Sequence, residues 1–305
     1  MLTVKPWPVE AIVRLVLSVI LCAYAGSVLI SVQAYAAAGV RGNAKLFFPL
    51  AAGALVCLAA ALGLIARAWP PEGISRRLAG LVVCAYSGLL LGAWAQQLSG
   101  AGAGDASLSR MLMAALSFHG AGLILIGRFL REQQTHWTAA FGLAHRWRRA
   151  ALMGALGALL FLPMGWGLQK VSALVLTHLP HLGLTPKEQL PVTALREALT
   201  WGGRLSLGAA AVLLAPVAEE TMFRGILYPV IKQAGYPRLA WWGTALLFAL
   251  VHLNLVTFVP LLVLALLLTE LYERTGNLLA PITAHLLFNA LNFAALLVLQ
   301  HYGGA

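Results

Sequence analysis

The sequence has few charged residues and almost no aspartate. Only 10% of its 305 residues are charged, and Asp105 is the one aspartate. An intramembrane protease that works with two aspartates is therefore excluded. The chain also lacks the His-Glu-x-x-His helix of zinc proteases, the Gly-x-Ser-x-Gly turn of serine hydrolases and the P-loop lysine motif of ATP-driven pumps.

Cysteine is also scarce. Cys22, Cys57 and Cys84 all lie inside apolar runs, and none forms a Cys-x-x-Cys pair. This pattern argues against a disulfide framework and against a thiolate metal site. We expect the three cysteines to be small core residues.

What the sequence has in abundance is apolar residues: 60% are hydrophobic, and the mean hydropathy is +0.83. Crossing a bilayer takes about 20 apolar residues. Nine stretches approach that length, at about 11–38, 47–66, 79–97, 111–127, 150–176, 200–218, 239–253, 257–272 and 278–299. The sequence therefore predicts an all-α, polytopic membrane helix bundle with about 8–9 transmembrane helices, placed in a lipid bilayer.

The first stretch has a second interpretation as a cleavable signal. Lys5 and Arg14 precede its apolar core, and Ala34-Tyr35-Ala36 resembles a cleavage site. Its length favours a retained helix.

The net charge of +11 comes mostly from Lys and Arg in short links between the apolar stretches. Such residues orient a membrane protein, so we expect no nucleic-acid partner. The most basic links, 67–77 and 128–149, are placed in the cytoplasm, which corresponds to a multi-pass protein of the bacterial inner membrane. The link 128–149 mixes aromatic residues with cations, as interfacial segments do. We expect it to divide an accessory transmembrane half, 1–127, from a catalytic transmembrane half, 150–305.

Three minor features lie outside the motifs. The Gly-Ala-Gly-Ala-Gly stretch at 100–104 is typical of a flexible turn. The tract 177–200, which contains His178, Pro180, His181, Pro186 and Pro191, is polar enough for an outer loop or a lid. His119 stands alone in an apolar segment and is expected to be a core residue.

The most unusual stretch follows the apolar run 205–217 and contains Glu219, Glu220 and Arg224. Ionised groups inside a membrane cost roughly 2.5–3.5 kcal/mol each on insertion scales, so they indicate function. Glu220 and Arg224 are four residues apart on a helix and can pair. Glu219 is rotated by about 100° and can face another partner.

Two further polar constellations follow within 90 residues, at Phe248-x-x-x-His252 and at His285-x-x-x-Asn289. The four-residue spacing puts His285 and Asn289 on one helix face. Taken singly, His252 reads as an interfacial helix end and Asn289 as a contact between helices. Together with the carboxylate pair, they predict one polar site.

This set of residues suits peptide-bond hydrolysis. Glu219 would act as the general base that activates water, and His285 with Asn289 would stabilise the oxyanion. His252 would orient the water or share its proton. As an alternative, Glu219, His252 and His285 would bind a metal ion, with zinc as the candidate.

The three motifs resemble those of the CPBP group of intramembrane proteases, which includes type II CAAX prenyl endopeptidases, bacteriocin-processing proteins and Abi proteins. The resemblance covers about 195–297. It implies that Glu219 is the water-activating base, that Glu220 and Arg224 support it, that His252 assists, and that His285 and Asn289 hold the oxyanion. It also implies a membrane-associated substrate, such as a prenylated or lipidated tail, a sorting signal or a leader peptide. Glutamic and metal-dependent mechanisms both stay open.

A transporter or binding protein would use the same Glu, His and Asn residues as an ion or proton site. Residues 1–127 contain no second pair of glutamates like Glu219-Glu220, and this disfavours the transporter alternative. On the topology above, Glu219 and Arg224 lie near the cytoplasmic side, and the cavity opens from that leaflet toward mid-membrane.

Overall fold

The computed structural model describes residues 5–37, 43–67, 69, 73–99, 108–178, 189–198 and 200–302. The turn expected at 100–104, as well as Pro180, His181 and Pro186 of the expected outer loop, lie outside these ranges. The chain divides into two compact units, Trp7–Phe129 and Met1–Pro6 with Leu130–Ala305. The functional labels given to the two halves, accessory and catalytic, stay predictions.

Throughout the described ranges the regular structure is helical, with no strand. Eight helices there are long and apolar enough to cross a membrane: Val9–Ala37, Ala44–Ile65, Ile74–Leu98, Leu108–Glu132, Trp147–Thr177, Trp201–Gln233, Leu255–Thr275 and Leu279–Gln300. The prediction of an all-α, multi-pass membrane bundle is confirmed.

Two expected segments have different bounds in the structure. The stretch 200–218 continues as a helix to Gln233, because its polar motif is paired inside the protein and does not end the helix. The stretch 239–253 forms α12 (Pro237–Leu250), which has 14 residues and is about 21 Å long. That is short for a hydrocarbon core of about 30 Å, so α12 is not one of the eight spans.

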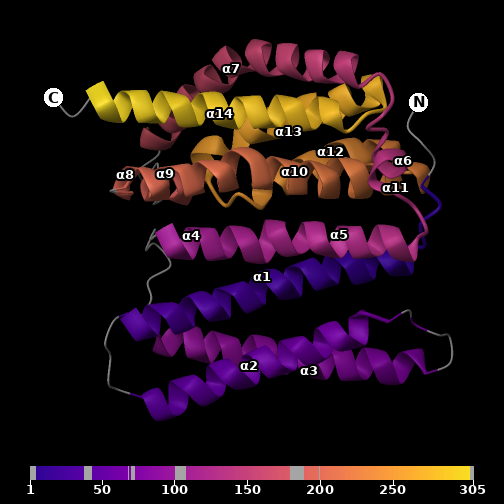
Figure 1. Cartoon of the computed structure of the whole chain (residues 1–305), viewed down its shortest axis with the longest axis vertical. Coiled ribbons are helices and arrows are strands. Elements are labelled where there is room, and N and C mark those ends of the chain that lie inside the picture. Colours follow the sequence, from indigo (N-terminus) through magenta and orange to yellow (C-terminus); the bar gives the residue numbers. More distant parts are fainter. Residues whose placement is uncertain are drawn as a thin grey trace. The chain divides into compact units, whose positions relative to one another are not determined.

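The unit Trp7–Phe129 is built on α1 (Val9–Ala37), α2 (Ala44–Ile65) and α3 (Ile74–Leu98), followed by α4 (Leu108–Ala115), the π-helix η1 (Leu116–Gly120) and α5 (Ala121–Glu132). Helices α2 and α3 lie side by side (Figure 1). The three cysteines are half-buried, less enclosed than the expected core residues. His119 lies in η1, with its ring 4.9 Å from that of Phe118.

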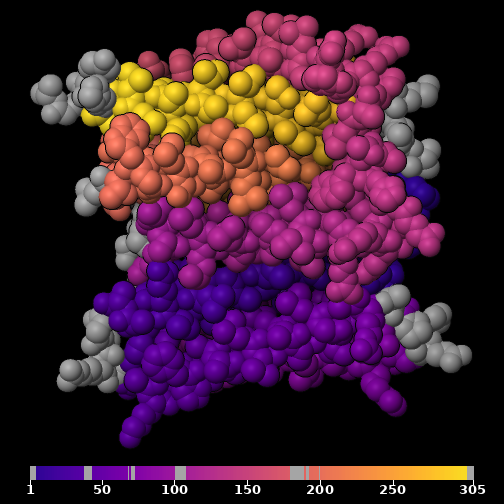
Figure 2. Space-filling view, in the orientation of Figure 1, coloured from indigo at the N-terminus to yellow at the C-terminus, as the bar shows by residue number. Residues whose placement is uncertain are grey.

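The other unit begins with α6 (Trp137–Phe141), α7 (Trp147–Thr177) and α8 (Leu190–Glu197). One long helix then runs through α9 (Trp201–Gly208), the π-helix η3 (Ala209–Leu214), α10 (Ala215–Glu220), the π-helix η4 (Thr221–Leu227) and α11 (Tyr228–Gln233). It is followed by α12, α13 (Leu255–Thr275) and α14 (Leu279–Tyr302). Figure 2 shows α14 in yellow packed along its length against neighbouring helices.

Small residues let α7 approach its neighbours closely. A Cβ added at Gly154 would collide with the Ala280 carbonyl of α14, and one at Gly157 would lie 3.1 Å from the Leu271 side chain of α13. Small residues are typical of helix contacts inside membranes, where tight packing replaces the hydrophobic effect. The core of the unit consists of side chains from α7, η4, α12, α13 and α14, among them Phe161, Phe223, Phe248, Leu264 and Leu268.

Two turns meet at one end of this unit. Asn277, between α13 and α14, donates from Nδ2 to the carbonyls of Leu143 (3.3 Å) and His145 (2.7 Å), which lie between α6 and α7. The basic link expected over 128–149 contains parts of three helices: α5 runs to Glu132, α6 has five residues, and α7 begins at Trp147.

The tract 177–200 was expected to be a loop or a lid, and part of it is helical as α8. Just before α8, Gln189 donates from Nε2 to Thr257 Oγ1 of α13 over 2.8 Å. Asn254 is the N-cap of α13, and its Oδ1 accepts from the Thr257 amide over 3.0 Å. The start of α8 is therefore attached to the start of α13.

Candidate functional site

The two glutamates lie near the middle of the longest span. Glu219 follows Trp201 by 18 residues and precedes Gln233 by 14, which corresponds to roughly 27 Å and 21 Å along a helix. The stretch expected from the sequence stops at 218, whereas this helix continues to Gln233. The expected position of the glutamates near the cytoplasmic side stays a prediction. The glutamates thus lie near the middle of a helix that is long and apolar enough to cross a membrane, where ionised groups are kept only with partners.

Arg224 and Glu220 form a pair that is closed to solvent. Arg224 Nη1 donates to Glu220 Oε1 over 2.9 Å, and the two side chains are 1% and 0% exposed. Arg224 Nη2 also donates to the Ala265 carbonyl of α13 over 2.9 Å, and the guanidinium lies 4.6 Å from the Phe248 ring centroid. The pairing that the i, i+4 spacing indicated is present, and it joins η4 to both α12 and α13.

His285 of α14 lies between the two glutamates. Its Nδ1 is 2.9 Å from Glu220 Oε1, and its Nε2 is 4.0 Å from Glu219 Oε2. Glu220 Oε1 acts as the acceptor, so His285 carries its proton on Nδ1 and donates a hydrogen bond from there to Glu220. Glu220 Oε1 therefore accepts from Arg224 and His285 together.

Glu219 is held differently from Glu220. Its side chain is 13% exposed, against 0% for Glu220. The distance of 4.0 Å between Glu219 Oε2 and His285 Nε2 is longer than a hydrogen bond allows. Glu219 is thus the less enclosed of the two carboxylates, although its Oε2 atom is itself buried.

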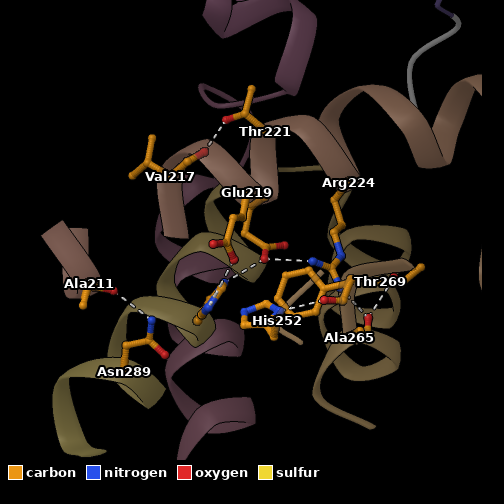
Figure 3. A network of polar contacts seen from close by, with 12 residues as sticks. Ala211, Val217, Glu219, Thr221, Arg224, His252, Ala265, Thr269 and Asn289 are labelled. Carbon is orange, nitrogen blue, oxygen red and sulfur yellow. Dashed lines mark hydrogen bonds and ion pairs between the residues drawn. The ribbon is translucent and has the colours of Figure 1, made fainter. Parts of the chain in front are cut away.

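His252 lies in the turn between α12 and α13. Its Nδ1 donates to the Phe248 carbonyl over 2.7 Å, because a carbonyl can only accept, and this leaves Nε2 for another group. The Phe248 ring lies 4.9 Å from the His252 ring and 5.7 Å from the His285 ring. Figure 3 shows His252 and Glu219 directed toward the same region beneath the long helix.

Asn289 lies one helical turn after His285 on α14. Its Nδ2 donates over 2.8 Å to the carbonyl of Ala211 in the π-helical stretch η3, as Figure 3 shows. The two residues thus point toward the same long helix, but at different points along it. Since π-helical turns often occur at functional sites, η3 and η4 belong to the description of this one.

Some partners could not be found from the sequence. The carbonyls of Ala211 and Ala265 accept hydrogen bonds from Asn289 and Arg224, and Thr269 Oγ1 also donates to Ala265 over 2.9 Å. Backbone carbonyls leave no trace in side-chain motifs. The Phe248 ring could have been found, because it stands four residues before His252.

The metal alternative requires Glu219, His252 and His285 around one ion. Among the residues that the structure describes, no group of three or more His, Cys, Asp or Glu side chains is arranged to hold a metal. His285 Nδ1 is directed at Glu220, and His252 Nδ1 at a backbone carbonyl. These contacts leave Nε2 of both rings available, which is also how zinc-binding histidines are held, so the zinc alternative stays a prediction.

This part of the chain is similar to known proteins. Residues 201–291, which include every residue of the polar site, match the family described as Type II CAAX prenyl endopeptidase Rce1-like. No solved structure matches the chain at a significant level.

Two curated relatives are similar over a short region. An uncharacterized Bacillus subtilis protein, YpbD, is 34% identical over 93 residues, which cover 29% of this chain and 44% of that protein. An uncharacterized 24.3 kDa protein of Escherichia coli is 38% identical over 80 residues, or 24% of this chain and 36% of that protein. The chain thus spans less than half the length of either relative. The segment 201–291 is thus similar to the Type II CAAX prenyl endopeptidases of the Rce1-like family.

Proposed function

We propose that this protein is an intramembrane endopeptidase that hydrolyses a peptide bond of a membrane-associated substrate. The single observation that carries the proposal is the position of Glu219. It is partly exposed beside a buried Arg224–Glu220–His285 network at mid-span. The Rce1-like match over 201–291 supports the same class of reaction.

In this mechanism Glu219 is the general base. It takes a proton from a water molecule whose oxygen attacks the carbonyl carbon of the scissile peptide bond. When the C–N bond breaks, the protonated Glu219 gives that proton to the leaving nitrogen. A positioned base of this kind typically contributes about 10²–10⁴-fold to the rate.

The remaining residues hold the base and the oxyanion. Arg224 and Glu220 fix His285, whose Nε2 faces the Glu219 side. Asn289 would donate its second amide hydrogen to the oxyanion, and His285 would donate from Nε2 in its doubly protonated form, since Nδ1 already donates to Glu220. Loss of one such donor typically costs about 10²–10³-fold. His252, with Nε2 left available, would orient the attacking water.

The proposal passes no step through a metal ion, since no group of three or more His, Cys, Asp or Glu side chains that could hold one is found among the described residues. Cleavage should therefore persist when the purified protein is dialysed against 1,10-phenanthroline. A loss of activity that zinc restores would contradict this part of the mechanism.

The proposed substrate is a peptide presented next to a lipid anchor, as the words CAAX prenyl endopeptidase in the family description suggest. A base near the middle of a helix that can cross the membrane would suit a substrate that already lies in the bilayer. The proposed location is the bacterial inner membrane, with access from the cytoplasmic leaflet.

The test is a cleavage assay on a farnesylated peptide ending in Cys-a-a-X, with the products identified by mass spectrometry. The wild type should release the last three residues, Glu219→Gln should not, and Glu197→Gln on the exposed face of α8 should match the wild type. Equal cleavage by wild type and Glu219→Gln would overturn the proposal. If the peptide stays intact with every variant, the substrate assignment is wrong.

A further inference from the structure

A second polar site lies away from the glutamates, where α11, α12 and α13 meet. It is a surface depression of about 390 Å³, lined among others by Lys232, Arg238, Trp241, Trp242, Glu270 and Glu273. Its volume falls in the range of about 300–1,000 Å³ that small-ligand sites occupy. None of these residues takes part in the proposed hydrolysis.

The depression lies at the ends of candidate membrane spans. The span Trp201–Gln233 ends beside Lys232, the span Leu255–Thr275 ends just after Glu273, and α12 begins at Pro237. Helix ends that leave the bilayer lie in the headgroup layer, where Trp residues gather. Trp242, which is 53% exposed, and Trp241 fit that layer.

The charges in the depression balance. Lys232 and Arg238 supply two cations, and Glu270 and Glu273 supply two carboxylates. Glu273 is already engaged, because Oε1 accepts from the Tyr228 hydroxyl over 2.6 Å and is paired with Lys232. Glu270 has only an exposed contact to Arg274, at 2.5 Å, and such pairs are weak. Arg238 and Glu270 are thus the two charges most available to a ligand.

We propose that the depression binds the headgroup of a phospholipid that carries a phosphate and a primary ammonium, namely phosphatidylethanolamine. Arg238 binds the phosphate with help from Lys232, since guanidinium and phosphate form strong charge-assisted hydrogen bonds. The ammonium donates to Glu270 and lies against the indole faces, where cations are attracted. Because the depression is open to the surface, the acyl chains can follow the neighbouring helices into the bilayer.

The test uses the full-length protein in detergent and native mass spectrometry, with dihexanoyl-phosphatidylethanolamine as the probe. The matched probes are dihexanoyl-phosphatidylglycerol, which lacks the cation, and dihexanoyl-phosphatidylcholine, whose quaternary ammonium cannot donate to Glu270. The ethanolamine lipid should bind most tightly. Arg238→Gln and Glu270→Gln should each weaken it about tenfold, the loss of one contact to a charged group.

Arg148→Gln is the control, because it removes an exposed charge near the start of α7, outside the depression. It should bind the ethanolamine lipid as the wild type does, and so should Glu219→Gln, whatever its activity. Equal or tighter binding of the glycerol lipid, unchanged binding in Arg238→Gln, or an equal loss in Arg148→Gln would overturn the proposal. Lys232 is left intact, because it is paired with Glu273 across α11 and α13.

Discussion

His285 Nδ1 and Glu220 Oε1 are 2.9 Å apart, and the same carboxylate oxygen accepts from Arg224. The sequence separates His285 from Glu220 by 65 residues, yet in the fold Glu220 connects a histidine of α14 to an arginine of η4. Glu220 therefore holds other residues in place, while the side chain of Glu219, one position earlier, is 13% exposed.

The buried pair should matter far more for stability than a surface pair of the same spacing. Arg224→Ala strands Glu220 without its counter-charge, and breaking a buried pair typically costs about 3–5 kcal/mol. Arg274→Ala breaks the exposed i, i+4 pair with Glu270, and such pairs contribute only about 0–1 kcal/mol. Fluorescence-detected size exclusion and thermal melting in detergent should show a clear loss of folded protein for Arg224→Ala alone. Equal losses would mean that Glu220 does not depend on Arg224.

Substitutions at His285 should separate holding from catalysis. Asparagine places an amide nitrogen close to the position of Nδ1, so His285→Asn should keep the contact to Glu220 and the yield of folded protein. It removes Nε2, so cleavage should fall by about 10²–10³-fold if that nitrogen is an oxyanion donor. His285→Leu removes both nitrogens and should lower yield and activity together. Full activity in His285→Asn would exclude a role for Nε2.

Lys5 should make stability depend on pH. Its Nζ donates to the Ala140 carbonyl, and its backbone amide donates to Gln233 Oε1 over 2.8 Å. Burial lowers the pKa of Lys5 from 10.5 to about 8. Between these values the unfolded chain binds more protons than the folded one, so the free energy of unfolding should rise with pH from about 8 to 10.5, by roughly 1–3 kcal/mol.

The measurement is thermal melting in detergent from pH 7 to 10.5, compared between the wild type and Lys5→Met. Only the difference between the two curves reports on Lys5, since other groups titrate in the same range. The melting temperature of the wild type relative to that of Lys5→Met should be constant below pH 8 and should rise above it. A constant difference over the whole range would show that Lys5 is not desolvated.

The orientation in the membrane can be tested with a single cysteine. A cysteine at Gln233, the last residue of α11, would remove the hydrogen bond from the Lys5 amide. Tyr236, which is 61% exposed in the following turn, is therefore the better position. With the native cysteines replaced by alanine, Tyr236→Cys should react with a membrane-impermeant maleimide only when the cytoplasmic side is exposed. Labelling in intact cells would show that the orientation in the membrane is the reverse of the expected one, and would favour exported substrates.

The sequence predicts the local contacts of this site better than its backbone. Glu220 and Arg224 pair because four residues bring side chains together on any helix, so spacing alone was enough. The π-helical stretches η3 and η4 could not be predicted, because they involve contacts with side chains of distant helices. One example is Asn289 of α14, which donates to the Ala211 carbonyl of η3. The continuation of the long helix to Gln233 was missed for a related reason: polar residues lower the hydropathy but do not end a helix whose charges are paired.

The most direct test of the central claim is the origin of the oxygen in the product. Wild type and Glu219→Gln, reconstituted in vesicles, are incubated with the farnesylated peptide in H₂¹⁸O, and the new carboxyl terminus is weighed by mass spectrometry at early times. If Glu219 activates water, the wild-type product carries one ¹⁸O, and Glu219→Gln forms no product above the protein-free blank. A product from Glu219→Gln at the wild-type rate, or a wild-type product without ¹⁸O, would contradict the account.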